Sequence, residues 1–322
     1  MDEKLLENAF QAIISAQRIL IISHIRPDGD AVGSLIGLGL SLNAKGKSVQ
    51  MVSTDGVPAI FSHLPGNNQI QKKARGDFDL TIVVDCSDLS RAGDILHGKP
   101  IPDINIDHHP TNTNFAKINL VDQNAVATAE ILAQYLEIFG FPITTQVAEA
   151  LLFGMITDTL GFRTANMTPK ALKIAAVLME HGGNLPVLYQ KGLLDKSFTA
   201  ARYWGAGLSN LEKEGRIIWT SLSLEERKAV GYKGRDDAEL VNFLSTIEET
   251  DIVIIFVEQD DGFVKVSWRS QPAFDVSLVA LFFGGGGHAA AAGATIKGDL
   301  KKIQTDVIAK TKAILGLQET FA

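Results

Sequence analysis

Short runs of β-branched and aliphatic residues recur along the first half of the chain and alternate with stretches of helical periodicity. The hydrophobic runs lie at residues 18–24, 48–53, 79–85 and 103–107. Helical patterns lie at residues 31–46, 124–140 and 144–157. Strands that alternate with helices in this way are typical of a mainly parallel sheet that is covered on both faces. We therefore predict an α/β fold for this half.

The pattern changes in the second half of the chain. Residues 168–211 have an almost uninterrupted helical pattern, after which strand patterns return at 216–222, 252–258 and 263–269. The sequence Asp260-Asp261-Gly262 predicts a hairpin turn between the last two strands. With 322 residues the chain is long enough for two domains. We predict a first domain at 1–186, a helical linker at 187–214 and a smaller α/β domain at 215–322.

Composition excludes several classes of protein. The hydrophobic content of 46% and charged content of 21% are those of a globular protein, not a disordered one. A net charge of -7 argues against a dedicated binder of duplex nucleic acid, although a small anion held by metal ions remains compatible with it. The single cysteine, Cys86, excludes an intramolecular disulfide and a cysteine-rich zinc site. Without a signal-like or membrane-spanning segment, we expect a cytoplasmic protein with no membrane partner.

Four clusters of acidic and histidine residues follow the ends of predicted strands and helices. The first, HIRPDGD at 24–30, comes directly after the first strand, and its Pro and Gly bend the chain so that two aspartates can approach His24. The other three are Asp85, the triplet Asp107-His108-His109, and Asp158. Ligands of open α/β sheets bind beyond the carboxyl ends of the strands. We therefore expect these side chains to share one rim of the first sheet.

Each cluster also has an interpretation that involves no chemistry. Asp30 is placed to cap a helix that starts at Ala31, and Asp85 and Asp158 are placed at the ends of a buried strand and an apolar helix. Cys86 is interpreted as a packing residue. The triplet that contains two adjacent histidines is the hardest to explain by packing, and it favours a functional site.

A site built from these clusters would contain four carboxylates and two imidazoles. They belong to His24, Asp28, Asp30, Asp85, His108 and Asp158. So many carboxylates would repel one another, and some would protonate, unless cations lay between them. One ion needs only three or four ligands, so the surplus predicts two divalent ions. Oxygen and imidazole ligands without thiolate favour Mn²⁺, with Mg²⁺ and Co²⁺ as alternatives.

The order and spacing of these residues resemble the four motifs of the DHH phosphoesterase family, and the resemblance covers nearly the whole chain. Near the C-terminus, Phe283, four glycines and His288 resemble the hallmark of the DHH-associated domain, and the segment VSWRS at 266–270 resembles a substrate-gripping segment of that domain. The resemblance is closest to the stand-alone NrnA type, which combines oligoribonuclease and 3'-phosphoadenosine 5'-phosphate phosphatase activities. It implies a DHH catalytic domain joined by the linker to a DHH-associated domain.

The resemblance also implies a role for each residue. One ion would be held by His24, Asp28 and Asp85, and the other by Asp30, Asp85, His108 and Asp158, so that Asp85 bridges them. An activated water would attack phosphorus in line. His109 would stabilise the developing charge or protonate the leaving oxygen, and Asp107 would orient a histidine. Arg163 lies where the family often has a basic residue, and we assign it to substrate binding.

The second domain is expected to hold the far end of the substrate. The expected contacts are Arg269, Ser270, Gly285, Gly286, Gly287 and His288. A glycine loop leaves backbone N–H groups free to approach a phosphate or base, and the alternative is a flexible hinge. Arg269 is suited to bidentate binding of a terminal phosphate, and the alternative is a solvated charge at a strand edge.

We therefore expect a two-metal hydrolase of phosphodiester or phosphomonoester bonds. Its substrates would be short single-stranded RNA or DNA, from dinucleotides to five-mers, and small nucleotides such as 3'-phosphoadenosine 5'-phosphate. The alternatives are a phosphodiesterase of linear or cyclic dinucleotides, a RecJ-like single-strand exonuclease, and a nucleotide sensor without activity. A sensor is disfavoured because no metal ligand is missing. The sequence is also compatible with a homodimer.

Overall fold

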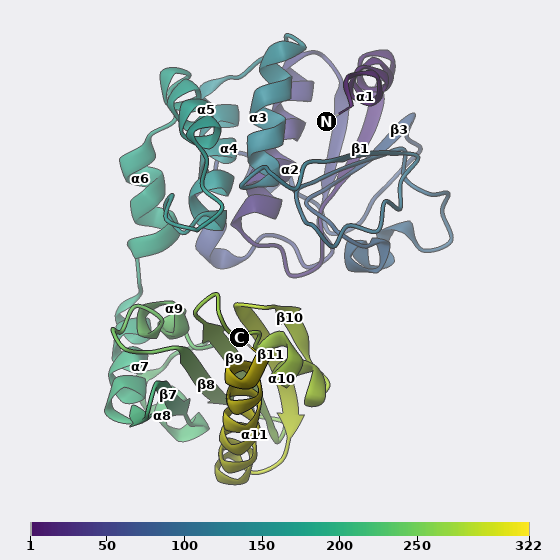
Figure 1. The fold of residues 1–322 in the computed structure, drawn as a ribbon. Coiled ribbons are helices and arrows are strands. Elements are labelled where there is room, and N and C mark those ends of the chain that lie inside the picture. The colour runs from purple at the N-terminus through teal and green to yellow at the C-terminus, as the bar shows by residue number, and fades with distance from the viewer. Residues whose placement is uncertain (1, 322) are drawn as a thin grey trace. The chain divides into compact units, whose positions relative to one another are not determined.

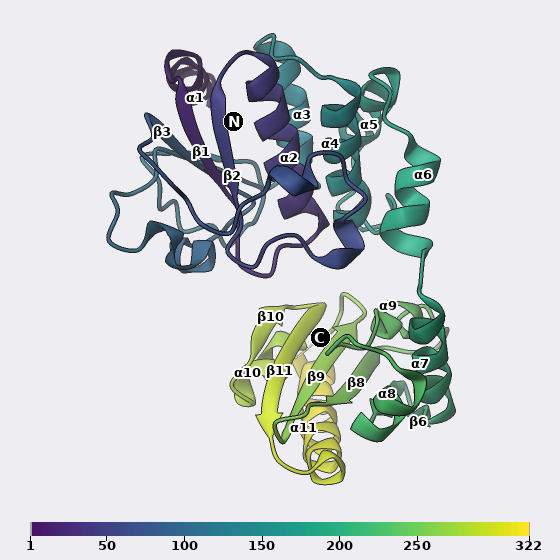
Figure 2. The same cartoon turned by 180° about the vertical axis from the view of Figure 1, so that it is seen from behind.

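The computed structural model of the protein describes residues 2–321, and its contacts divide the chain into two compact units, Met1–Asp195 and Lys196–Ala322 (Figures 1 and 2). The stretch 187–214, expected as a separate linker, is divided between them. Leu188 packs into the core of the first unit, whereas Ala200 and Tyr203 pack into a core of the second. No helix within residues 2–321 has both the length and the apolar character that crossing a membrane requires.

The first unit contains a five-stranded parallel sheet with the strand order β2-β1-β3-β4-β5. The strands are β1 (Arg18–Ile22), β2 (Ser48–Val52), β3 (Leu80–Val84), β4 (Ile104–Asp107) and β5 (Ile118–Val121). The helices are α1 (Glu3–Ser15), α2 (Gly29–Ala44), α3 (Thr128–Ile138), α4 (Thr145–Asp158), α5 (Pro169–Glu180) and α6 (Leu185–Tyr189). Shorter helical segments are η1 (Ala59–Phe61), η2 (Asn67–Gln69), η3 (Leu89–Leu96) and η4 (Gln190–Leu194). The predicted parallel α/β domain is confirmed, while α1 and β5 have no counterpart in the sequence-based prediction.

The two faces of this sheet are covered unequally. Ile19 and Ile21 of β1 face the large core that α1, α2, α3 and α4 complete, and these helices lie on the same side of the sheet in Figure 1. Leu20 and Ile22 face the other way, into a small cluster completed by η3 and neighbouring loops. Both faces are buried, as predicted, but the second is covered by a short irregular segment rather than by a layer of long helices.

Helices α2 and α4 approach each other so closely that their contact requires glycine. A Cβ atom at Gly33 of α2 would lie 2.4 Å from the backbone oxygen of Ala150 in α4. A Cβ atom at Gly154 of α4 would lie 2.8 Å from Asp30 Oδ1 and 2.8 Å from the Ala129 Cβ of α3. The close approach brings the N-terminus of α2, which carries Asp30, next to the C-terminal end of α4, which carries Asp158.

The second unit is built on a six-stranded mixed sheet with the order β10-β11-β9-β8-β7-β6. The strands are β6 (Glu212–Glu214), β7 (Ile217–Leu222), β8 (Ile252–Glu258), β9 (Phe263–Ser270), β10 (Gly286–His288) and β11 (Ala291–Lys297). The helices are α7 (Phe198–Ser209), α8 (Leu224–Val230), α9 (Leu240–Leu244), α10 (Ser277–Phe282) and α11 (Leu300–Phe321). The predicted strands β7, β8 and β9 are present, whereas β6, β10, β11 and the helices α8, α9, α10 and α11 were not predicted.

The side chains of β9 alternate between the two faces of this sheet. Val264, Val266 and Trp268 are buried in the core that α10 and α11 cover. Lys265 and Arg269 lie on the opposite face, where α7 and α9 cover β7 and β8 and α9 also contacts β9. The predicted substrate residue Arg269 is half-buried on this face.

Candidate metal centre

Three central strands of the first sheet end in residues of the predicted site. Strands β1, β3 and β4 are neighbours and run parallel, so their carboxyl ends lie side by side at one edge. His24 follows β1, Asp85 follows β3, and Asp107 is the last residue of β4. Helix α2 begins at the same edge and α4 ends there, which adds Asp30 and Asp158. The fold thus gathers the four sequence clusters at a single rim.

His24, Asp28 and Asp85 form the first group with the geometry of a metal site. His24 Nε2 lies 3.5 Å from Asp85 Oδ2 and 3.8 Å from Asp28 Oδ2. The other ring nitrogen, Nδ1, lies 2.8 Å from the carbonyl oxygen of Ile25. When Nδ1–H donates to that carbonyl, the lone pair of Nε2 faces the two carboxylates. These are the three residues assigned to the first ion from the sequence.

Asp30, His108 and Asp158 form a second group, with one ligand atom of each lying within 4.8 Å of the others. His108 Nε2 is 3.5 Å from Asp158 Oδ2 and 3.8 Å from Asp85 Oδ1. A third combination, Asp85, His108 and His109, also satisfies the 4.8 Å criterion. Asp85 thus belongs to the first group and to this third combination, and it approaches Asp158 and Asp30 through His108, a position suited to a ligand shared by two ions.

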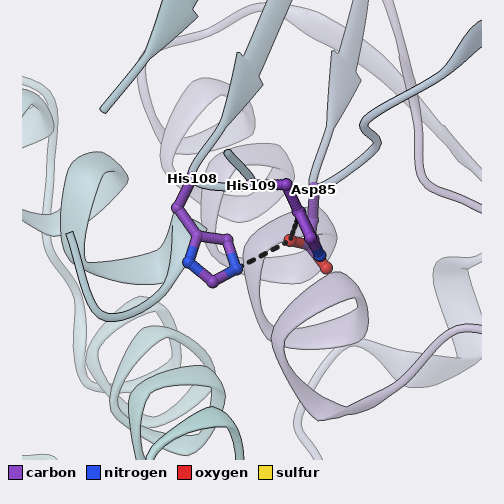
Figure 3. Close-up of side chains that lie close together, drawn as sticks. All are labelled: Asp85, His108 and His109. Atoms are coloured by element: carbon purple, nitrogen blue, oxygen red, sulfur yellow. Dashed lines mark ion pairs between the residues drawn. The ribbon is translucent and has the colours of Figure 1, made fainter. Parts of the chain in front are cut away.

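Asp85 has an unusual backbone for a buried aspartate. Its φ angle of 53° lies in the left-handed region, which costs a residue with a Cβ atom about 1–3 kcal/mol. Its side chain is 1% exposed. Figure 3 shows His108 and His109 both directed at its carboxylate, with dashed lines for the 3.8 Å separations from His108 Nε2 and His109 Nδ1 to Asp85 Oδ1. The strained backbone turns this carboxylate into the cluster.

The floor of the centre is buried and its rim is exposed to solvent. His24, Asp30, Asp85 and Asp107 are buried, whereas the side chains of Asp28 and Asp158 are 58% and 30% exposed. Burial, together with the nearby charges of Asp85 and Asp158, raises the pKa of Asp30 well above its ordinary value. Burial also raises the pKa of Asp158 to about 7, an effect that His108 opposes and Asp85 reinforces. The positive groups of the protein alone therefore do not fully balance the negative charge of the clustered carboxylates.

The chemistry of the donor set fits divalent cations. His24 Nε2 and Asp85 Oδ2 are both buried, and neither has a hydrogen-bond partner among the described residues. Buried polar atoms are rarely left in this state, because each loses its interactions with water. Two such atoms 3.5 Å apart, one of them a carboxylate oxygen, would both be satisfied by a cation bound between them. Carboxylate and imidazole ligands without thiolate suit Mn²⁺ and similar ions.

His109 is held differently from its neighbour His108. Its Nδ1 lies 2.7 Å from Oδ1 of Asp107, which is fully buried. Asn112 donates a hydrogen bond of 2.6 Å to the other oxygen of Asp107, so both carboxylate oxygens are fixed. Burial opposes a charge on His109, but Asp107 and Asp85 outweigh it and raise the pKa of the ring to about 9. Sequence reasoning assigned Asp107 to a histidine, but it did not find Asn112.

The two aspartates of the first cluster cap different helices. Asp28, not Asp30, caps α2: the helix begins at Gly29, and Asp28 Oδ1 accepts a 3.0 Å hydrogen bond from the amide of Ala31. The alternative interpretation, in which Asp30 caps a helix that starts at Ala31, is therefore wrong. Asp30 Oδ2 instead accepts from the amide of Thr128 at 2.6 Å, at the N-terminus of α3. Asp30 Oδ1 accepts from the amide of Ala129 at 3.0 Å.

Thr128 and Arg163 complete the description of this unit. Thr128, which sequence reasoning missed, is fully buried and donates a 2.9 Å hydrogen bond from Oγ1 to Asp85 Oδ1. The helix was predicted at 124–140, so Thr128 lay inside it and carried no signal of a helix end. Arg163 is exposed on the turn after α4, and its backbone amide donates to the carbonyl of Thr159.

In the second unit, Arg269 and His288 lie in one row across three strands. Arg269 of β9 pairs with Ala291 of β11, which pairs with His288 of β10. Residues paired in this way point to the same face of an antiparallel sheet, so a small alanine separates the two predicted substrate residues. Arg269 Nη1 donates to the carbonyl of Trp268, and Ser270 Oγ donates to the carbonyl of Phe274 at 2.7 Å.

The glycine run is not the open loop expected from the sequence. Gly286, Gly287 and His288 form β10, which pairs with β11. A Cβ atom at Gly285 would lie 2.2 Å from the carbonyl oxygen of Gly293, and one at Gly287 would lie 2.5 Å from that of Ala291. Gly287 also has φ at 145°, a conformation that favours glycine. The glycines therefore allow close strand pairing, and the expected loop conformation is wrong for Gly286 and Gly287.

Comparison with known proteins identifies both units. Residues 18–155 match the model of the N-terminal domain of the DHH family, and residues 228–313 match the DHHA1 domain. A protein of Thermus thermophilus named bifunctional oligoribonuclease and PAP phosphatase NrnA is 33% identical over 286 residues, which cover 87% of this chain and 84% of the relative. A Mycoplasma genitalium protein of the same name is 28% identical, covering 93% of this chain and 94% of the relative.

Solved structures agree with the fold. An exopolyphosphatase-related protein from Bacteroides fragilis matches with a TM-score of 0.90 and 24% identity, over 99% of this chain and 98% of that protein. RecJ from Thermus thermophilus, solved in complex with Mn²⁺, matches with a TM-score of 0.54 and 16% identity, over 96% of this chain and 54% of RecJ. At these identities the likeness concerns the fold alone.

Proposed function

The chain belongs to the DHH family and is a hydrolase of phosphoester bonds, and on that premise we propose that it cleaves very short oligonucleotides with the help of two divalent cations. The proposed substrates are single-stranded RNA or DNA from dinucleotides to five-mers, and 3'-phosphoadenosine 5'-phosphate. The relatives named for oligoribonuclease and PAP phosphatase activities, aligned over most of their length, support this choice.

The observation that carries the proposal is the meeting of two ligand groups at one rim. His24, Asp28 and Asp85 form one group, and Asp30, His108 and Asp158 form the other. We propose that these six residues hold two cations, of which Mn²⁺ suits the donor set best and is also the ion in the related RecJ structure. Bound there, the cations would supply Lewis-acid stabilisation of the phosphoryl group and activation of the attacking water.

The protein's own residues would orient the substrate and deliver a proton. Because Asp107 and Asn112 fix Nδ1 of His109, the ring presents Nε2 for contact with the substrate. We propose that this nitrogen stabilises the developing charge or protonates the leaving oxygen. Arg163 in the first unit, and Arg269, Ser270, Gly285, Gly286, Gly287 and His288 in the second, would contact the remainder of the nucleotide.

Hydrolysis of a graded substrate panel in the presence of Mn²⁺ tests the proposal. The panel contains a 5'-phosphorylated dinucleotide, a five-mer, a 20-mer, a cyclic dinucleotide and 3'-phosphoadenosine 5'-phosphate. We expect the highest kcat/KM on the dinucleotide and 3'-phosphoadenosine 5'-phosphate, and a falling rate toward the 20-mer. Asp94→Asn provides a control, because Asp94 is exposed on η3 outside both ligand groups.

Other outcomes would assign the protein differently. Digestion of the 20-mer at the dinucleotide rate would indicate a RecJ-like exonuclease, and preference for the cyclic substrate would indicate a cyclic-dinucleotide phosphodiesterase. If a folded wild-type protein loaded with Mn²⁺ cleaves none of these substrates, the proposed hydrolysis is refuted.

A further inference from the structure

The N-terminus of α3 contacts two of the carboxylates in the metal centre although it contributes no ligand itself. Thr128 Oγ1 donates to Asp85 Oδ1 at 2.9 Å, and the amides of Thr128 and Ala129 donate to the two oxygens of Asp30 at 2.6 and 3.0 Å. All of these groups are buried. We propose that this helix end is a positioning element: the Thr128 hydroxyl holds Asp85, and the amides of Thr128 and Ala129 hold Asp30, ready for cations.

The helix end is built so that its donors are available to Asp30. Ala127, the residue that precedes α3, provides no side-chain cap. Glu130 reaches back to the amide of Val126 with a 2.7 Å hydrogen bond, and this leaves the next amides to be capped from elsewhere. The first amides of a helix have no partner within it and carry partial positive charge. Here the carboxylate of Asp30 from α2 accepts hydrogen bonds from these amides. The same carboxylate is therefore both the cap of α3 and a proposed metal ligand.

Counting lone pairs shows how this arrangement limits each carboxylate. Asp30 Oδ1 accepts from Ser34 Oγ at 3.2 Å as well as from Ala129, and Oδ2 accepts from Thr128. A carboxylate has about four acceptor positions, so about one remains for Asp30, on Oδ2. Asp85 is held through Oδ1, while its Oδ2 has no hydrogen-bond partner among the described residues. Asp30 therefore offers a cation one oxygen, whereas Asp85 offers Oδ2 and a remaining position on Oδ1, as a ligand shared by two cations requires.

Preorganisation of this kind has a consequence for metal affinity. A ligand that is already fixed loses no side-chain freedom when a cation binds, and hydrogen-bonding partners behind metal ligands typically contribute 10–100-fold to affinity. The inference rests on the proposed two-cation site, but it concerns affinity rather than the reaction. It assigns to Thr128 a role that no ligand motif in the sequence indicates.

A calorimetric titration of the metal-free protein with Mn²⁺ measures its Mn²⁺ affinity and tests the role of Thr128. Thr128→Val keeps the branched shape but removes the hydroxyl, and we expect its Mn²⁺ affinity to fall about tenfold or more. Thr128→Ser restores the donor and should return the affinity to within about threefold of wild type. At limiting Mn²⁺, Thr128→Val should cleave a dinucleotide more slowly than the wild type. At saturating Mn²⁺, its kcat should return most of the way to the wild-type value.

Thr220→Val is the matched control. Thr220 is equally buried and donates its hydroxyl to the carbonyl of Gly207 in the second unit. Its replacement should lower the unfolding temperature without changing Mn²⁺ affinity. If Thr128→Val does not fold, as judged by circular dichroism without metal, Thr128→Ala replaces it in the same titration.

Three results would overturn the inference. They are wild-type affinity in Thr128→Val or its alanine substitute, a loss in Thr128→Ser as large as in Thr128→Val, and an equal loss in Thr220→Val. Failure of the proposed function is distinguishable from these. A wild type that binds Mn²⁺ but cleaves no nucleotide would refute the function, while the affinity ratios would still decide the role of Thr128. A wild type that binds no Mn²⁺ would refute the metal centre and this inference together.

Discussion

Replacement of Arg269 by alanine separates the role of the second unit from that of the metal centre. The guanidinium donates one hydrogen bond to the carbonyl of Trp268, so about four of its five N–H donors remain for a substrate. Losing a charge-assisted hydrogen bond to phosphate costs roughly 1.5–3 kcal/mol. At 1.36 kcal/mol for each factor of ten, we expect kcat/KM on a dinucleotide to fall by about 10- to 150-fold.

The change should be confined to substrate binding. Arg269 lies in the second unit, whereas all six proposed metal ligands lie in the first, so Mn²⁺ affinity should be unchanged. The loss should appear mainly in KM if the contact is equally strong in the ground and transition states. Arg269→Lys keeps the charge without the planar donor pair and should show an intermediate loss.

Steady-state kinetics on two substrates provides the assay. One substrate is a 5'-phosphorylated dinucleotide, and the other is bis(p-nitrophenyl) phosphate, which lacks a nucleotide to anchor. Lys265→Ala is the control, since Lys265 is exposed on the same strand and face but is not assigned to the substrate. Equal losses on both substrates in Arg269→Ala would show that Arg269 supports the fold or the metal centre, and the anchoring role would be refuted.

Three further predictions concern the metal centre and β10. Asp85→Ala should abolish turnover and lower the Mn²⁺ stoichiometry measured by metal analysis; retention of more than about a tenth of wild-type activity would contradict a bridging role. Removal of metal with EDTA should lower the unfolding temperature. Adding Mn²⁺ at about 100 times its Kd should raise the free energy of unfolding by about 2.7 kcal/mol. An unchanged unfolding temperature would argue against specific binding. Gly287→Ala should destabilise the second unit by about 1–3 kcal/mol in a denaturant titration, because its Cβ would lie 2.5 Å from the carbonyl oxygen of Ala291. Its Mn²⁺ affinity should not change.

The sequence allowed the rim of the first sheet to be predicted because parallel strands all present their carboxyl ends at one edge. His24, Asp85 and Asp107 each follow or end a run with an unmistakable strand pattern, so their proximity followed from the fold class. Thr128 was beyond such reasoning. Its amide bonds to Asp30 across 98 residues of sequence, and no local pattern encodes that contact.

Strand β10 was missed for a different reason. Glycine has a low preference for strands, and a three-residue strand of two glycines and a histidine has no alternating pattern. It forms because β11 lies beside it and because side chains that would block the approach are absent. The same glycines that were interpreted as freeing the backbone for a ligand serve first to let two backbones meet.

The glycine contact between α2 and α4 bears on how the metal centre tolerates change. Because Gly33 meets the backbone of α4 directly, no compressible layer of side chains separates the two helices at this point. Asp30 and Asp158 extend from these helices close to the contact, so the spacing between the two carboxylates is set by main-chain atoms in van der Waals contact. Such a backbone contact prevents the two helices from moving closer together. Core substitutions elsewhere in the unit can lower its stability while this spacing stays the same, whereas a single methyl group at Gly33 would force it to widen.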